Sequence, residues 1–127
     1  MLVDDNIDDN FFHERTILKS DMANTVLVKQ SANDALEYLV THADHSSATH
    51  PDLIFLDINM PGMNGWEFLE KYAGLEHDQQ SRVVIVMLTT AENDIEKARA
   101  LAYNFVADFK TKPLTKDMLS EIAEKYF

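Results

Sequence analysis

The sequence predicts an α/β fold, a doubly wound parallel sheet of five strands with helices on both faces. Short apolar runs alternate with segments of helical apolar spacing, and five such pairs fill the 127 residues. The run at 53–56 is apolar throughout and bounded by turn-forming residues, which is typical of a strand buried on both faces. Such alternation gives βαβ units with right-handed crossovers. We therefore expect one domain over residues 1–127, with no output domain.

The apolar runs are the expected strands. They lie at residues 1–3, 25–28, 53–56, 83–88 and 105–109. The first has only three residues before an acidic pair, so N-terminal residues missing from this sequence are one explanation for its shortness. Polar segments at 41–50 and 74–81 are expected to be surface loops.

The helices are expected between these runs. Ser31, with Asp34 three residues later, and Thr115 mark two N-termini. The predicted helices cover about 8–20, 32–40, 66–73, 95–102 and 118–126. The first is the least regular, with apolar residues at Phe11, Phe12, Ile17 and Leu18.

Composition excludes several classes of partner and site. The chain has 11 Lys and Arg against 22 Asp and Glu, a formal net charge of -11. This charge repels nucleic acid and anionic membranes, so neither is expected as a partner. The sequence has no apolar run long enough for a membrane span and no signal peptide, so a cytoplasmic location is expected. With no cysteine, it has no disulfide, thiolate metal site or cysteine nucleophile.

Carboxylates stand where two of the strands end. Asp4 and Asp5 follow the first strand, and Asp57 follows the third. In open α/β sheets, ligands bind outside the carboxyl ends of the strands. Three converging carboxylates repel one another unless a cation lies between them or one takes up a proton. Mg²⁺, which prefers oxygen ligands, is the expected cofactor.

The last two strands end in groups that suit a phosphoryl ligand. The fourth supplies the hydroxyl of Thr89 or Thr90, and the fifth is followed by the ammonium of Lys112. An ammonium and a metal can neutralise phosphoryl oxygens while a hydroxyl donates to one of them. Asp57, alone at its strand end, is then the expected nucleophile, because carboxylates form acyl-phosphate intermediates.

Four motifs give the chain a strong family resemblance. They are "LVDDN" at 2–6, "LIFLDINMPGMNGWEFL" at 53–69, "VVIVMLTTAEN" at 83–93 and "DFKTKPLT" at 108–115. Together they resemble the receiver (CheY-like) domains of two-component response regulators. The resemblance implies a flavodoxin-like fold in which Asp57 accepts a phosphoryl group from a phosphohistidine. The donor would be a sensor histidine kinase or a histidine phosphotransfer protein.

The same resemblance assigns roles around the acceptor. Asp4 and Asp5 match the acidic pair that positions Mg²⁺, with Asp5 the more direct ligand. Asn59 matches the position whose backbone carbonyl completes the coordination. Lys112 matches the lysine that pairs with the phosphoryl group. The bond from Lys112 to Pro113 matches a peptide that is typically cis.

The resemblance also implies a switch. A threonine hydroxyl moves toward the phosphoryl group while Phe109 turns inward. Thr90 is favoured over Thr89, because an alanine follows it and its spacing to Lys112 is the commoner one. The readout surface would comprise the fourth helix, fifth strand and fifth helix, where a downstream protein or a second copy of the chain could bind. It would include Ile95, Ala98, Phe109 and Leu114.

Other readings remain open. The chain could be a receiver module detached from a hybrid histidine kinase, or an adaptor that works without phosphorylation. A Mg²⁺-dependent aspartate-nucleophile phosphatase is a more distant alternative, because such enzymes use a second acid two residues after the nucleophile, where this sequence has Asn59. We expect no enzyme activity beyond self-phosphorylation and self-dephosphorylation. A zinc site is conceivable in one loop, whereas His13 and His77 are expected on the surface; the loop residues are His42, Asp44, His45 and His50.

Overall fold

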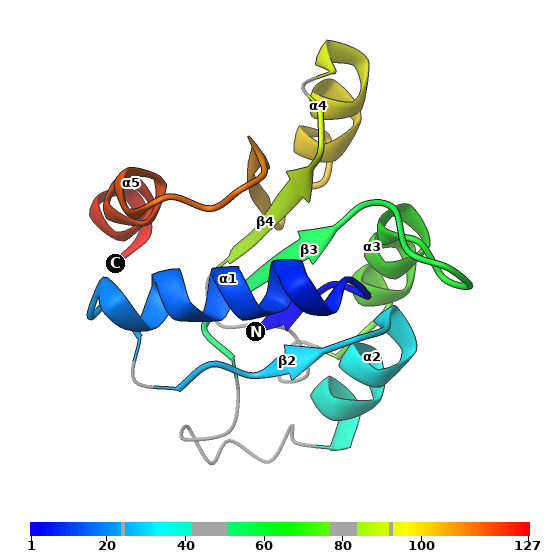
Figure 1. The fold of residues 1–127 in the computed structure, drawn as a ribbon. Coiled ribbons are helices and arrows are strands. Elements are labelled where there is room, and N and C mark those ends of the chain that lie inside the picture. The colour runs from blue at the N-terminus through cyan, green and yellow to red at the C-terminus, as the bar shows by residue number, and fades with distance from the viewer. Residues whose placement is uncertain (24, 42–50, 77–83, 92) are drawn as a thin grey trace.

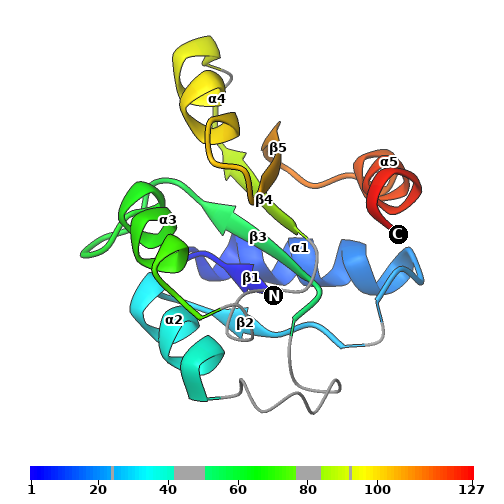
Figure 2. The same ribbon diagram turned by 180° about the vertical axis from the view of Figure 1, so that it is seen from behind.

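The expected α/β architecture is present. The computed structural model describes residues 1–23, 25–41, 51–76, 84–91 and 93–127. They form one parallel five-stranded sheet in the order β2-β1-β3-β4-β5, with helices on both faces (Figures 1 and 2). The proposed zinc ligands and His77 lie outside the described residues.

The strands follow the predicted runs, with one clear shift. They are β1 (Leu2–Val3), β2 (Val28–Lys29), β3 (Leu53–Asp57), β4 (Val84–Thr89) and β5 (Val106–Thr111). The second strand was predicted at 25–28 and is shorter and later. Among the described residues it pairs with β1 alone, and the two residues of β1 give two register positions, Leu2 to Val28 and Val3 to Lys29.

The helices begin at polar caps. They are α1 (Ile7–Lys19), α2 (Ala32–Thr41), α3 (Gly65–Ala73), α4 (Asp94–Leu101) and α5 (Lys116–Tyr126). Asn6 caps α1, and Asn64 forms a capping box with Glu67 at α3. Asn93 and Thr115 accept backbone hydrogen bonds at the starts of α4 and α5. Each cap satisfies amide groups that the helix itself leaves unpaired.

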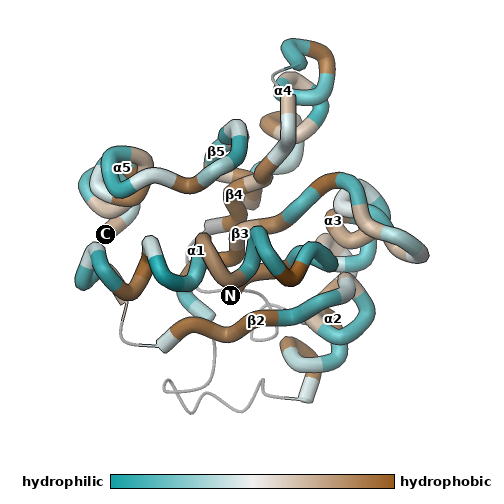
Figure 3. Tube along the Cα trace, in the orientation of Figure 1, coloured by the Kyte–Doolittle hydropathy of each residue, from teal (hydrophilic) through white to brown (hydrophobic). Residues whose placement is uncertain are grey.

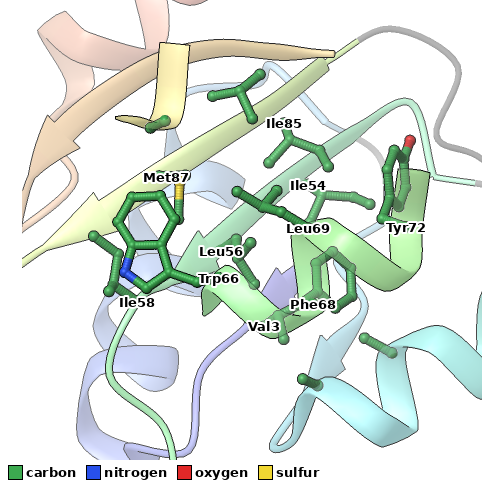
Figure 4. Packing of buried hydrophobic residues seen from close by; sticks show 14 of the residues in the cluster. Val3, Ile54, Leu56, Ile58, Trp66, Phe68, Leu69, Tyr72, Ile85 and Met87 are labelled. Carbon is green, nitrogen blue, oxygen red and sulfur yellow. The ribbon is translucent and has the colours of Figure 1, made fainter. Parts of the chain in front are cut away.

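Two apolar clusters cover the two faces of the sheet. On one face α2, α3 and Ala100 of α4 pack against β-strand residues such as Ile54 and Met87 (Figure 4). On the other face α1 and α5 pack against Phe55, Val86 and Leu88. Adjacent strand residues thus face opposite sides, as the pleat requires.

α1 departs from the expected pattern. Of the four apolar residues assigned to it, only Ile17 is buried, while Phe11, Phe12 and Leu18 are exposed. His13, which we expected on the surface, is buried. The helix therefore turns polar as well as apolar residues inward, and its tube in Figure 3 changes between teal and brown along its length.

α4 touches the rest of the molecule over a small area. It projects beyond the sheet in both ribbon views (Figures 1 and 2), and Ala100 is its only buried residue. Ile95 is 82% exposed, and Ala98 is exposed as well. The expected readout surface therefore needs a correction, because Phe109 and Leu114 are buried. None of the described helices is long and apolar enough to cross a lipid bilayer.

Candidate functional site

Three carboxylates meet at the carboxyl edge of the sheet. Asp4 directly follows β1 and Asp57 ends β3, and these strands are neighbours with Val3 paired to Leu56. One oxygen from each of Asp4, Asp5 and Asp57 lies within 4.8 Å of the others. Asp4 and Asp57 are buried, while Asp5 is exposed. The cluster is therefore anchored in the fold on one side and open to solvent on the other.

Lys112 brings a positive charge into this cluster from β5. Its Nζ lies 2.7 Å from Asp4 Oδ2, 2.8 Å from Asp9 Oδ2 and 3.3 Å from Asp57 Oδ1. The backbone amide of Lys112 donates to Thr89 O at 2.7 Å, and the bond to Pro113 is cis. The lysine thus contacts the expected nucleophile and one of the expected metal ligands together.

Burial and charge shift the protonation of these groups. Burial, followed by the nearby Asp4 charge, raises the pKa of Asp57 to about 6, although Lys112 opposes the shift. Burial disfavours the Lys112 ammonium, but its hydrogen bonds to Asp4 and Asp9 outweigh this and raise its pKa above the ordinary value. Lys112 is therefore charged at neutral pH, and the Asp57 carboxylate is less stable there than an exposed one.

The turn after Asp57 depends on two glycines. Gly62 has φ +73°, a left-handed conformation that L side chains rarely adopt. A Cβ on Gly65 would lie 2.7 Å from the Asp57 carbonyl oxygen and 2.9 Å from Ile58 Cα. The exposed Asn59 lies in this same turn. These glycines let the chain leave β3, pass the site and enter α3 without displacing Asp57.

The two candidate threonines lie differently. Thr89 is buried, and its hydroxyl donates to Ala91 O at 3.1 Å. Thr90 is exposed and comes two residues after Leu88, which is paired with Asp57 in the sheet. Thr89 is the last residue of β4, so strand alternation places it on the opposite side of the sheet from Leu88, whereas Thr90 follows the strand. Phe109 is buried among the apolar residues of the α2/α3 face.

α1 adds polar groups beneath the site that the sequence reasoning missed. Asp9, Asn10 and His13, with the cap Asn6, recur at i, i+3, i+4 and i+7, so they share one helical face. Asn10 Nδ2 donates to the Asp4 carbonyl at 2.8 Å. Burial and then the Lys112 charge lower the pKa of His13. The same periodicity was visible in the sequence, but in polar rather than apolar residues.

The cluster can hold a divalent cation. Three carboxylates offer hard oxygen donors close together on a partly open edge, which is the donor set that Mg²⁺ prefers. The raised pKa of Asp57 points the same way, because buried like charges favour either a proton or a cation. The residues present therefore fit Mg²⁺.

Comparison with known proteins agrees with this geometry. Residues 1–124 match the response regulator receiver domain family. The two-component response regulator ARR5 of Arabidopsis thaliana is 29% identical, covering 100% of this chain and 73% of that protein. ARR6 of the same plant is 32% identical, covering 90% of this chain and 61% of that protein.

Solved structures match over nearly the whole chain. A two component response regulator from Cytophaga hutchinsonii has a TM-score of 0.88 at 27% identity, covering 98% of this chain and 92% of that one. A response regulator receiver protein from Dyadobacter fermentans has a TM-score of 0.84 at 30% identity, covering 98% and 93%. The flavodoxin-like arrangement of strands and helices is thus shared with both.

Proposed function

Because the chain belongs to the response regulator receiver family, we propose that it accepts a phosphoryl group on Asp57 in a two-component phosphorelay. The observation that carries the proposal is the position of this carboxylate. Asp57 ends the central strand, 3.3 Å from the Lys112 ammonium and within the three-carboxylate cluster. Asp57 is the last residue of β3, the middle strand of the sheet. The other two carboxylates of the cluster, Asp4 and Asp5, follow the end of β1.

The transfer uses groups that are present in the site. An Asp57 oxygen attacks the phosphorus of a phosphohistidine, the P–N bond breaks, and its electron pair stays on the imidazole nitrogen. The product is an aspartyl phosphate. Lys112 then pairs with a phosphoryl oxygen and the Thr90 hydroxyl donates to another.

Mg²⁺ would be held by Asp4, Asp5 and Asp57, with the Asn59 carbonyl as a further ligand. When bound, it neutralises charge on the phosphoryl oxygens and on the carboxylates. The buried Asp4 and Asp57 supply the fixed side of this site, and the exposed Asp5 supplies the side from which the ion enters.

Signalling would pass through protein contacts. Thr90 and Phe109 form the proposed switch, and the accessible part of the readout surface is the α4 face with Ile95 and Ala98. The expected partners are a sensor histidine kinase or a histidine phosphotransfer protein, a downstream protein in the cytoplasm, and a second copy of the chain. The sensor histidine kinase GacS of Pseudomonas protegens matches 99% of this chain over 13% of its own length. A module of a hybrid kinase therefore stays the second candidate.

The test is intact-mass spectrometry after incubation with acetyl phosphate, with and without Mg²⁺. We expect one phosphoryl adduct that requires Mg²⁺ and is lost in Asp57→Asn. Asp52→Asn, at the opposite end of β3, is the matched control and should keep the adduct. An adduct that survives in Asp57→Asn, or no adduct at all on the parent, would refute the proposal.

The same sample separates the remaining alternatives. An adaptor that works without phosphorylation would bind its partner equally well before and after acetyl phosphate treatment. A phosphatase would turn over small phosphate esters many times, whereas we expect no turnover beyond the slow loss of the chain's own phosphoryl group. Asn59 stands where such a phosphatase would need an acid.

A further inference from the structure

We infer that Asp9 is a positioning residue, whose carboxylate keeps the Lys112 ammonium in place when Mg²⁺ draws Asp4 away from it. The inference rests on the proposed function, because it concerns the same metal and phosphoryl site. The inference starts from the ion pair between Lys112 Nζ and Asp9 Oδ2, at 2.8 Å. Asp9 belongs neither to the four motifs nor to the three-carboxylate cluster.

The lysine has two short contacts and one long one. Asp4 and Asp9 each accept a hydrogen bond, at 2.7 and 2.8 Å, while Asp57 lies 3.3 Å away. Charge-assisted hydrogen bonds of the shorter kind are the stronger ones. Before phosphorylation, Lys112 is therefore held mainly by Asp4 and Asp9.

These two carboxylates have different second roles. Asp4 belongs to the three-carboxylate cluster, so the lysine and a cation compete for its oxygens. Asp9 does not belong to that cluster and can stay with Lys112 when a cation is bound. Without Asp9, a bound cation would leave Lys112, whose side chain is only 10% exposed, paired with Asp57 alone, and the cation also uses Asp57.

The fold holds Asp9 in position. It lies in the first turn of α1, and its backbone amide donates to Asn6 Oδ1 at 3.0 Å. One residue further on, Asn10 Nδ2 donates to the Asp4 carbonyl at 2.8 Å, which ties the same turn to the end of β1. Asp9 and Asp4 are thus fixed relative to each other through the helix start, with Lys112 between them.

Asp8 is a natural control. It is the adjacent residue, carries the same charge in the same first turn of α1, and is exposed. Asp8→Asn removes the same unit of negative charge from the neighbourhood of the site. Any effect of Asp9→Asn beyond that of Asp8→Asn therefore comes from the contact with Lys112.

The test is a titration with MgCl₂ in the absence of any phosphodonor, followed by the fluorescence of the single tryptophan, Trp66, and repeated by calorimetry. We expect Asp9→Asn to raise the Mg²⁺ Kd about fivefold or more, and Asp8→Asn to change it less than about twofold. Equal effects of the two variants would overturn the inference.

A double-mutant cycle shows whether Asp9 acts through the lysine. In the background Lys112→Met, Asp9→Asn should change the Mg²⁺ Kd no more than Asp8→Asn does, because no ammonium remains to be held. The same loss of affinity in both backgrounds would mean a through-space charge effect and would refute the inference. Lys112→Gln serves as the background if Lys112→Met does not fold.

A second readout separates positioning from structural damage. At saturating Mg²⁺, Asp9→Asn should be phosphorylated by acetyl phosphate more slowly than Asp8→Asn, because the Lys112 ammonium that pairs with the phosphoryl group is no longer held, and this difference should vanish in the background Lys112→Met. A difference that persists in that background would mean structural damage and would contradict the inference. If the parent itself takes no phosphoryl group, the proposed function fails, while the MgCl₂ titrations still decide the role of Asp9.

Discussion

The two faces of the sheet differ in what they bury. The α2/α3 face is closed by large apolar side chains such as Phe68, Leu69 and Tyr72. The α1/α5 face is apolar around Ile17 and Leu119, but near the carboxyl ends of the strands it buries Asn10 and His13 below the carboxylates. The α2/α3 face therefore stabilises the fold, whereas the polar groups buried at the carboxyl edge of the α1/α5 face lower the stability and belong to a charged site.

The groups that lower the stability at the carboxyl ends of the strands can be identified. Asn10 Oδ1 and His13 Nδ1 are buried and, among the described residues, have no hydrogen-bond partner. A buried polar atom without a partner costs about 1–3 kcal/mol. The proximity of Asp4 to Asp57 adds repulsion, which Lys112 offsets in part. Substitutions on the two faces should accordingly change the free energy of unfolding by different amounts and in different directions.

The largest effect is expected on the apolar face. Phe68→Ala removes a fully buried ring and should lower the free energy of unfolding by about 3–5 kcal/mol. The Mg²⁺ affinity of the folded fraction should stay unchanged, because the ring lies on the far side of the sheet. Urea unfolding and MgCl₂ titration measure the two quantities, with the exposed Val40→Ala in α2 as control. A large loss of Mg²⁺ affinity in Phe68→Ala would break the contrast between the faces.

Gly65→Ala should lower both the stability of the fold and the affinity for Mg²⁺. The added Cβ would meet backbone atoms at 2.7 and 2.9 Å, so the turn after Asp57 must shift. We expect a loss of about 1–3 kcal/mol in the free energy of unfolding and weaker Mg²⁺ binding. Gly74→Ala is the matched control, since its Cβ would make an ordinary 3.5 Å contact. If both substitutions behave alike, the close approach at Gly65 has no energetic importance.

Asp57→Asn should stabilise the protein without Mg²⁺. The folded state binds the Asp57 proton more tightly than the unfolded state, because the pKa rises from 3.8 to about 6 on folding. This contribution is therefore favourable below about pH 4 and is lost as the pH rises through 6. The rise to about 6 already includes the opposing pairing with Lys112, so the gain in the free energy of unfolding at pH 7 is at most about 3 kcal/mol.

Denaturation of Asp57→Asn and the parent from pH 4 to 8 checks this sign. The difference in unfolding free energy should widen as the pH rises, and MgCl₂ should reverse it by stabilising the parent alone. Asp34→Asn, an exposed carboxylate in α2, is the control. A destabilised Asp57→Asn at pH 7 without Mg²⁺ would show that the lysine pairing outweighs burial and repulsion.

The smallest effect is expected when two helix caps of the same chemistry are removed in turn. Asn6→Ala and Asn64→Ala should each cost about 1 kcal/mol in the free energy of unfolding. Only Asn6→Ala should also weaken Mg²⁺ binding, because Asn6 fixes the turn that holds Asp9 beside Lys112. Thermal unfolding and MgCl₂ titration give both values. Equal Mg²⁺ affinities in the two variants would mean that the start of α1 does not position the site.

The sequence was most informative where periodicity and strand ends coincide. Five apolar runs and their helices predicted the architecture, and the acids and Lys112 at the strand ends predicted side chains that the fold brings together, while the role of Thr90 stays a prediction. The position of β2 could not be predicted, because it depends on how much of β1 is available for pairing.

The inward polar face of α1 was missed for a physical reason. A search for apolar stripes favoured Phe11, Phe12 and Leu18, and the polar repeat Asn6, Asp9, Asn10 and His13 gave no such signal. Asn10 turns inward to donate to the Asp4 carbonyl at the end of β1, and Asp9 pairs with Lys112, which is distant in the sequence.

The central claim is that Asp57, and not a neighbouring carboxylate, carries the phosphoryl group. Borohydride reduces an aspartyl phosphate to homoserine, so reduction after acetyl phosphate and Mg²⁺ treatment, followed by tandem mass spectrometry, marks the acceptor residue. We predict homoserine at position 57 and aspartate at positions 4, 5 and 9. Homoserine at any of those three positions, with intact aspartate at 57, would contradict the account.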